Sequence, residues 1–383
     1  MKPHRTFRRI VPILLAVSSP LSLSPTIAQG FGQGDLVVLQ VGDGSAALTS
    51  AATTVSLVEY DVTGHLRQSL ALPSTAGSPA RLTQAGSSTS EGYLSLSADG
   101  ASLAVVGYDA SPGTAGIAST TASAANRVLD KITSTGVISR MVSSASLFSS
   151  QNIRSGVISG SDAWAVGSSG GVVALTSPTP GSIYNSLTTL RVANIANGDL
   201  TFSSQSGTTT RGIYEFNGLP TASSTPVQII VEDSSAKPVD FSFSADATVA
   251  YVSDERTTGG GVQKWTKSGG VWSLSYTLNA GSGRGARGLA VDFSGLNPTV
   301  FATTTQNELI RLVDTGGGAV PTVLATAAAN LEWRGLEFAP IPEPGETAAA
   351  TGAGLAILAA VRHWQKVRRS RAESKTPSLI PFQ

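Results

Sequence analysis

The chain has no cysteine, only two methionines and three histidines among its 383 residues, and aromatic residues make up 6% of it. The lack of cysteine excludes disulfide bonds, a thiolate nucleophile and a zinc–thiolate site. Stability must therefore come from a large hydrophobic core, which about 310 residues can supply. A catalytic or metal-binding role for histidine would have to use His65, because it is the one histidine that lies outside the two ends of the chain.

Charged residues are also scarce, at 13%, and the formal net charge of +1 hides an uneven distribution. Of the 26 Lys and Arg, four precede residue 29 and six follow Ile341, which leaves 16; of the 25 Asp and Glu, three follow Ile341, which leaves 22. Sixteen minus 22 gives the middle of the chain a charge of −6. An acidic segment without a stripe of Lys and Arg among aromatics excludes nucleic acid as a partner.

Long apolar runs are confined to the two ends. At the N-terminus, four basic residues precede the apolar stretch 10–17, and small residues occupy the positions before Gln29 that a signal peptidase requires. We therefore predict that residues 1–28 are a signal peptide cut between Ala28 and Gln29. The protein is then exported.

The C-terminal run is closed by basic residues. Residues 347–361 are apolar and would span about 22 Å as a helix, against a hydrocarbon core of about 30 Å. The cations that follow are Arg362, Lys366, Arg368, Arg369 and Arg371. This pattern predicts a single, short transmembrane helix at 347–361 with its basic end in the cytoplasm and a short cytoplasmic tail at 372–383.

Residues 342–371, which begin with Pro342-Glu343-Pro344, resemble the PEP-CTERM sorting signal of Gram-negative bacteria. The resemblance implies recognition and cleavage by an exosortase-type membrane protease. It also implies transient anchoring in the inner membrane, and then a cell-surface or extracellular location. That route commonly accompanies exopolysaccharide production. The tail at 372–383 is longer than the usual end of this signal, and an ordinary single-span anchor is the alternative.

The middle of the chain, residues 29–341, predicts an all-β domain with internal repeats, because apolar residues alternate at period two between turn residues. The motif Ser-Ala-Asp at 97–99 recurs at 244–246, which is 147 residues later, or three periods of 49. Arg-Gly-Leu at 287–289 recurs at 334–336 after 47 residues. A period of 40–50 residues with four short strands is typical of a β-propeller.

Turn residues divide the domain into units. The first hairpin of a unit turns at an aspartate (Asp99, Asp162, Asp199 and Asp246), and the second turns at Thr/Ser-Gly (63–64, 135–136, 268–269 and 315–316). Blades are predicted near 92–143, 154–190, 191–232, 239–280 and 287–326. A sixth blade joins strands at 35–72 to a last strand at Trp333–Phe338, which closes the ring. We predict six blades, with seven as the alternative. The general form looks like that of secreted bacterial propellers that carry this sorting signal, which implies fold and location but no activity.

The best candidate ligand site lies on one face of the ring. Near the starts of the innermost strands the register places Glu91, Arg154, Asp240, Arg287 and Arg334, and in the loops from second to third strands it places Asp43, Asp109, Asp254 and Glu255. The carboxylates could hold Ca²⁺, and the arginines could bind a carboxylate or sulfate of an anionic sugar. The alternative is that Arg-Gly and Asp-Gly recur as strand-entry and turn chemistry. The loops lack the Asp-x-Asp-x-Asp spacing of a specific calcium site.

Other patterns favour structural roles. His65 follows the turn at 63–64 and is predicted to be a solvated residue of an outer hairpin rather than a member of a catalytic triad. The glycine-rich run 281–285 joins two strands, which favours a linker over a phosphate loop. The tryptophans within predicted strands favour packing between blades over sugar platforms: Trp164, Trp265, Trp272 and Trp333.

Two functional hypotheses remain. The first is a non-enzymatic surface or matrix propeller, without a cofactor, that binds exopolysaccharide or protein. The alternative is a secreted propeller hydrolase, of esterase, lactonase or phytase type, that uses Ca²⁺ and carboxylates in the funnel. Scattered carboxylates and a single histidine favour the first hypothesis.

Overall fold

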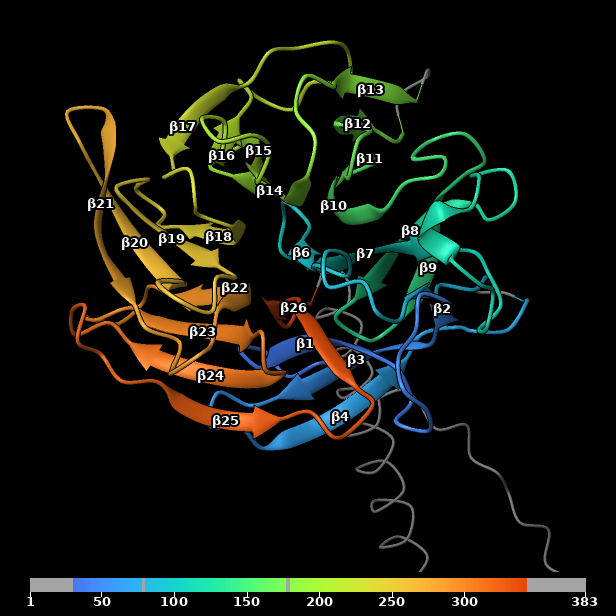
Figure 1. The fold of residues 1–383 in the computed structure, drawn as a ribbon, viewed down its shortest axis with the longest axis horizontal. Coiled ribbons are helices and arrows are strands. Elements are labelled where there is room, and N and C mark those ends of the chain that lie inside the picture. The colour runs from blue at the N-terminus through green and yellow to red at the C-terminus, as the bar shows by residue number, and fades with distance from the viewer. Residues whose placement is uncertain (1–29, 78–79, 177–179, 343–383) are drawn as a thin grey trace, which may run out of the picture.

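A computed structural model describes residues 30–77, 80–176 and 180–342, and these residues form six four-stranded antiparallel sheets around a central axis (Figure 1). The fold is a six-bladed β-propeller, which confirms the prediction of six blades rather than seven. Each sheet runs from an innermost strand at the axis to an outermost strand at the rim.

The blades are numbered from the one that holds the N-terminal strands, and their strands are given from the axis outward. Blade 1 comprises β26 (Glu332–Phe338), β1 (Leu36–Val41), β3 (Val55–Tyr60) and β4 (Leu66–Ala71). Blade 2 comprises β6 (Ser95–Leu96), β7 (Ser102–Tyr108), β8 (Arg127–Thr133) and β9 (Ile138–Ser144). Blade 3 comprises β10 (Ile153–Ser159), β11 (Asp162–Gly167), β12 (Val172–Ala174) and β13 (Gly181–Tyr184).

The remaining blades follow the same plan. Blade 4 comprises β14 (Leu190–Ala196), β15 (Asp199–Ser204), β16 (Gly212–Glu215) and β17 (Val227–Val231). Blade 5 comprises β18 (Pro238–Phe243), β19 (Val249–Asp254), β20 (Gly261–Ser268) and β21 (Val271–Leu278). Blade 6 comprises β22 (Ala286–Asp292), β23 (Thr299–Thr304), β24 (Glu308–Val313) and β25 (Thr322–Thr326). Outside the blades lie a two-stranded sheet of β2 (Ala52–Thr53) and β5 (Gln84–Ala85), and a 3₁₀ turn, η1 (Ile117–Ser119).

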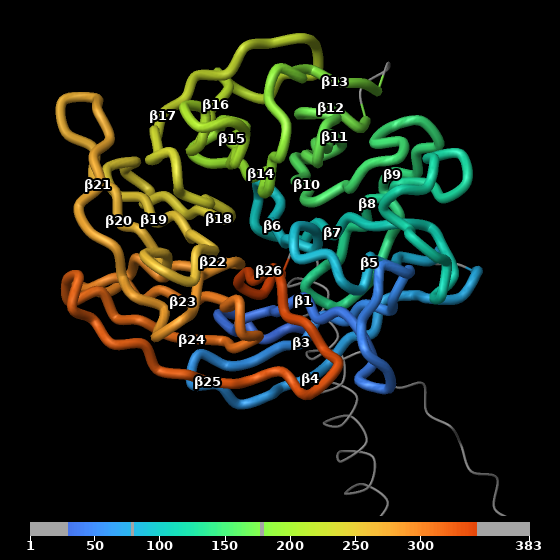
Figure 2. The backbone as a smooth tube through the Cα atoms, in the orientation of Figure 1, coloured from blue at the N-terminus to red at the C-terminus, as the bar shows by residue number. Residues whose placement is uncertain are grey.

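Strands from both ends of the described chain close the ring in blade 1, as the sequence predicted. The C-terminal strand β26 pairs antiparallel with β1, with Leu36 opposite Phe338 and Val38 opposite Leu336. The indole N–H of Trp333 donates a hydrogen bond of 3.0 Å to Gln40 Oε1. Figure 2 shows the red and blue ends of the trace side by side in this blade. The sheet edges that an open ring would expose are thereby paired.

The turns lie where the sequence placed them. The four aspartate turns join first and second strands, on a face that we call the lower face. The glycines of the second hairpins, Gly64, Gly136, Gly269 and Gly316, all have positive φ, a conformation that favours glycine over other residues. His65 follows the first of these turns at the outer edge of blade 1, with 79% of its side chain exposed, as predicted.

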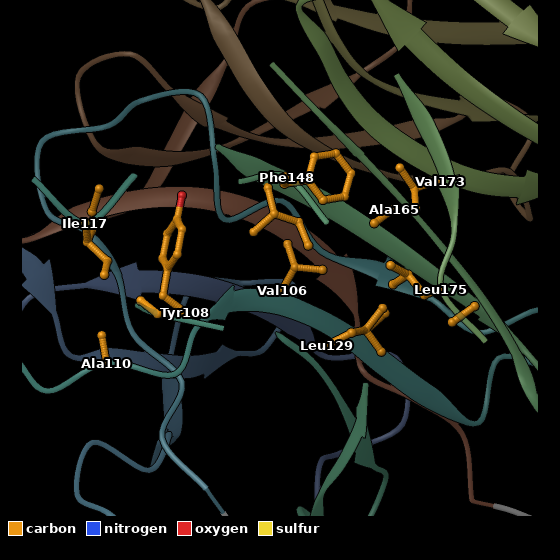
Figure 3. Packing of buried hydrophobic residues seen from close by; sticks show 14 of the residues in the cluster. Val106, Tyr108, Ala110, Ile117, Leu129, Phe148, Ala165, Val173 and Leu175 are labelled. Atoms are coloured by element: carbon orange, nitrogen blue, oxygen red, sulfur yellow. The ribbon is translucent and has the colours of Figure 1, made fainter. Parts of the chain in front are cut away.

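The hydrophobic core is divided among the six interfaces between neighbouring blades, with one buried cluster at each. Figure 3 shows the cluster between blades 2 and 3, where Val106 and Leu129 face Ala165 and Val173. Alternation along each strand supplies these residues, because every second side chain points toward a neighbouring blade.

Three of the four strand tryptophans, Trp164, Trp265 and Trp333, are buried between blades, as predicted. Trp272 agrees in part, because it packs against the cluster between blades 4 and 5 but is only partly buried. It lies on β21, the outermost strand of blade 5, where it packs edge-on against Phe243 at 5.5 Å and lies beneath the Lys267 ammonium at 5.6 Å. An outermost strand is only partly covered by the next blade, so this indole stays partly exposed.

Several predicted segments lie outside the described residues. They are the signal peptide at 1–28 with its cleavage site between Ala28 and Gln29, the sorting residues Glu343 and Pro344, the helix at 347–361 and the tail at 372–383. Pro342 is the last described residue. Within the part of the chain that the structure describes, no helix has the length and apolar character needed to cross a membrane.

Candidate functional site at the channel mouth

Four arginines occupy the same register position, near the start of an innermost strand. These are Arg154, Arg191, Arg287 and Arg334, on β10, β14, β22 and β26, and we call them the arginine ring. In blade 5 the equivalent position holds Val239, since Pro238 and Ala286 have matching places in their sheets. The arginine ring lies where the innermost strands begin, together with the loops that join second to third strands. We call this end of the central channel the upper mouth.

Two glutamates link three of these arginines into a network of alternating positive and negative charges. Glu255, in the loop after β19, accepts a hydrogen bond of 2.8 Å from Arg191 and lies 3.8 Å from Arg287. Glu332, at the start of β26, lies 3.1 Å from Arg287 and 3.0 Å from Arg334. This ion-pair network extends across blades 4, 5, 6 and 1, so it holds neighbouring blades together at the upper mouth.

Arg334 is saturated by structural partners. It has no exposed surface, and its Nη2 donates hydrogen bonds of 2.8 Å to the carbonyls of Ala85 and Gly86. Gln84 Oε1 lies 3.3 Å from its Nη1. This arginine therefore fastens β5 to the innermost strand of blade 1, which matches the strand-entry alternative.

Arg154 and Arg191 differ, because part of their hydrogen-bonding capacity is unused. Arg154 donates from Nη1 to the carbonyl of Leu190 at 2.9 Å and forms no ion pair with a described residue. Burial, and next the neighbouring charge of Arg191, lower the pKa of Arg154 to about 10. Arg154 Nε, Arg191 Nε and Nη1, and also Arg287 Nε, are buried without a hydrogen-bond partner among the described residues. Such groups cost about 1–3 kcal/mol each, so native proteins usually satisfy them with water or a ligand.

Glu91 and Tyr93 complete the upper mouth. Tyr93 is fully buried among the charges of the ring, its hydroxyl donates to the carbonyl of Thr89 at 3.0 Å, and burial raises its pKa to about 12. Glu91 is also fully buried, accepts a hydrogen bond of 3.2 Å from Asn152, and has a pKa raised by burial. Four arginines thus face three glutamates, one of which is driven toward its neutral form.

The predicted loop carboxylates each bind a separate neighbour. Exposed Asp43 accepts from the backbone N–H of Ser45 at 2.9 Å, and Asp109 pairs with Arg81 at 2.8 Å. Buried Asp254 pairs with Arg256 at 2.6 Å. Across the described ranges, no three His, Cys, Asp or Glu side chains are placed to hold a metal ion.

The other end of the channel, the lower mouth, is acidic. It opens into a cavity of about 320 Å³ whose wall includes Glu337 and Asn194. Burial raises the pKa of Glu337 to about 7. Asp240 accepts backbone hydrogen bonds from Leu289 at 2.9 Å and Phe241 at 2.8 Å, and burial, followed by the charge of Glu337, raises its pKa well above the ordinary value. Asp240 therefore interacts with the lower mouth, although the sequence grouped it with the arginines.

Sequence reasoning missed Arg191, Glu332 and Glu337. A signal for Arg191 exists, because it follows Arg154 by 37 residues and precedes Arg287 by 96, which is two blade periods of 48. The two glutamates carry no comparable signal, since each lies on the strand that closes the ring and meets partners from other blades.

No family model matches the chain, and no curated protein matches it. Solved structures of similar shape include the periplasmic gluconolactonase of Pseudomonas aeruginosa, at 15% identity and a TM-score of 0.43, with 78% of this chain and 83% of that chain covered. TolB from Acinetobacter baumannii is 13% identical with a TM-score of 0.48, over 81% and 68% of the two chains. A chain of the nidogen/laminin complex is 11% identical with a TM-score of 0.48, over 81% and 99%. Likeness at this level does not extend to activity.

Proposed function

We propose that this protein is an exported, non-enzymatic β-propeller of the cell surface or extracellular matrix that binds an acidic ligand, with acidic exopolysaccharide as the ligand class. The observation that carries the proposal is the pair of buried, incompletely satisfied guanidinium groups of Arg154 and Arg191. A uronate carboxylate or a sulfate supplies the missing acceptor and the missing negative charge together.

The upper mouth admits such a group at its surface. The side chains of Arg191, Glu255, Arg287 and Glu332 each keep 9–11% of their surface exposed, so solvent reaches their edges. Glu255 already pairs with Arg191 and limits affinity, because an incoming carboxylate has to share that arginine with it. This arrangement fits reversible binding of one acidic sugar unit within a polymer.

Calorimetric titration of the full-length chain with glucuronate tests the proposal. Replacing Arg191 with methionine keeps most of the buried stem but removes the donors, and we expect affinity to fall at least about tenfold. Arg67→Met is the matched control, since Arg67 is an exposed arginine on β4, with 54% of its side chain exposed. Equal affinities of wild type and the Arg191→Met variant would contradict the proposal.

The same titration, combined with a turnover assay in the presence of Ca²⁺ or of a chelator, distinguishes binding from the hydrolase alternative. A Ca²⁺-dependent hydrolase should turn over lactone or ester substrates with Ca²⁺ and lose that activity with a chelator. The carboxylates predicted for its metal, Asp43, Asp109 and Asp254, are engaged with separate neighbours. We therefore expect binding without turnover, and chelation to leave glucuronate affinity unchanged.

Export through a PEP-CTERM-like signal is the second part of the proposal, and it rests on the sequence of residues 342–371. In a host with an exosortase, we expect fractionation to recover protein without the C-terminal segment from the cell surface or medium. Glu343→Ala should leave full-length protein in the membrane. Retention of the tail by the wild-type protein in that host would support an ordinary anchor instead.

A further inference from the structure

A recess lies between blades 5 and 6 on the upper face of the ring, the face that contains the upper mouth. Its volume is about 440 Å³, within the range of ligand sites in proteins. The side chains that line it are Thr257, Thr258, Thr277, Asn279, Ser282 and Arg284, and the rest of the wall is glycine. We call it the polar cup.

The chemistry of the polar cup suits a neutral, hydroxyl-rich ligand. The one charge in its wall, Arg284, is neutralised because its Nη2 donates to Glu308 Oε1 at 2.8 Å. The hydroxyls of Thr257, Thr258 and Ser282 are exposed and form no side-chain hydrogen bond with a described residue. A wall of free hydroxyls, amides and backbone groups matches a sugar, which exchanges hydrogen bonds with water for similar ones with protein.

Glycine allows the polar cup to form. Gly281 has a φ of +113°, and a Cβ on this residue would collide with the Arg284 guanidinium. A Cβ on Gly260 would overlap the carbonyl of Arg256. The glycine-rich run 281–285, which the sequence presented as a linker, therefore also forms one side of a recess.

The polar cup adjoins the arginine ring through both of its loops. One loop begins at Glu255, which pairs with Arg191, and the other ends just before Arg287. The two loops touch, because a Cβ on Gly285 would overlap the backbone of Glu255. A sugar polymer whose acidic unit lies at the arginine ring thus has neighbouring units over the polar cup.

We infer that the polar cup is a second subsite that holds neutral sugar units next to the acidic unit bound at the arginine ring. The inference rests on the proposed function and specifies it: the ligand is a heteropolysaccharide that alternates uronate with neutral hexose. Affinity should then grow with chain length, because binding of the second unit becomes intramolecular.

The test is calorimetric titration of the full-length chain with glucuronate and with a tetrasaccharide of alternating glucuronate and glucose. The double variant Thr258→Val/Thr277→Val removes two hydroxyls from the polar cup at nearly constant volume. We expect tetrasaccharide affinity to fall about tenfold and glucuronate affinity to stay unchanged. Thr299→Val, at the start of β23 on the lower face, is the matched control and should leave both affinities unchanged.

Each outcome separates the two proposals. Equal tetrasaccharide affinity for the wild type and the double variant would overturn the polar cup inference. The proposed function would still stand in that case if glucuronate bound to the wild-type protein. Loss of glucuronate binding in the double variant would also overturn the polar cup inference, because the polar cup would then act only by supporting the ring. Absence of glucuronate binding to wild-type protein would overturn the proposed function itself.

Discussion

The upper mouth of the channel gathers four arginines, whereas the lower mouth holds Asp240 and Glu337, which form no ion pair with a described residue. The same innermost strands form both mouths. Longer loops from second to third strands meet the upper mouth and can supply glutamates such as Glu255. The lower turns are tight, and their aspartates bind within their own blade, as Asp99 does with the backbone N–H of Ala101 at 3.0 Å and Asp199 with the backbone N–H of Gly218 at 2.6 Å. Three of the four arginines at the upper mouth are therefore paired with glutamates, mostly across blades, whereas the carboxylates at the lower mouth are not paired with any described cation.

Removal of β26 from Trp333 onward should have the largest effect, because this part of the strand contributes Arg334 to the upper mouth and Glu337 to the lower mouth. Truncation before Trp333 exposes the edge of β1 and loses the burial of Trp333 and Leu336. We expect a loss of at least about 5 kcal/mol in the free energy of unfolding. Truncation after Ile341 should cost little, and equal melting temperatures for the two chains would refute the closure by β26.

Glycine allows neighbouring innermost strands to approach closely between the two mouths, and its replacement should have the next largest effect. A Cβ on Gly288 would overlap the backbone N of Leu336 on the neighbouring innermost strand. Gly288→Ala must push the strands apart, so we expect a loss of about 2–4 kcal/mol in denaturant unfolding. Gly318→Ala is the control, because its Cβ would have no neighbour within 4 Å. A similar small effect of both would mean that the innermost strands adjust freely.

Glu337 makes the stability of the lower mouth depend on pH. Its pKa rises from 4.5 to about 7 on folding, so the folded state holds its proton more tightly. The stabilisation is complete below pH 4.5 and is lost as the pH rises through about 7, at a cost of no more than about 3 kcal/mol. In Glu337→Gln this loss should vanish, and the variant should be more stable than wild type at pH 8 but not at pH 4. Parallel pH profiles of melting temperature would contradict this role.

The sequence predicted the blades and the closing strand because their signals are local. Apolar alternation, turn residues and the repeat period are visible in the stretch of sequence that forms each blade. The spacing between Arg287-Gly288 and Arg334-Gly335 indicates that the two pairs occupy equivalent positions in their blades. The charge network was less predictable, since pairing of Glu255 with Arg191 depends on how two blades dock. Asp254 shows the same limit: it is the last residue of β19 rather than part of the predicted loop, and its carboxylate pairs with Arg256, two residues later.

The smallest expected effect tests whether the two mouths act independently. Asp99 accepts hydrogen bonds from Ser97 Oγ at 2.5 Å and from the backbone N–H of Ala101 at 3.0 Å, in the lower turn between β6 and β7. Asp99→Ala should cost about 1 kcal/mol in unfolding free energy. These hydrogen bonds, and above all the one from Ser97, lower the pKa of Asp99 in the folded state. The stabilisation is therefore present when the pH is above the pKa of Asp in the unfolded chain, near 3.9, and is lost as the pH falls below that value. The difference in unfolding free energy between wild type and variant should therefore narrow below about pH 4.

Glucuronate affinity of the Asp99→Ala variant should not change, because the turn lies at the lower mouth and the arginine ring at the upper one. A weakened affinity in this variant would show that the mouths are coupled through the innermost strands.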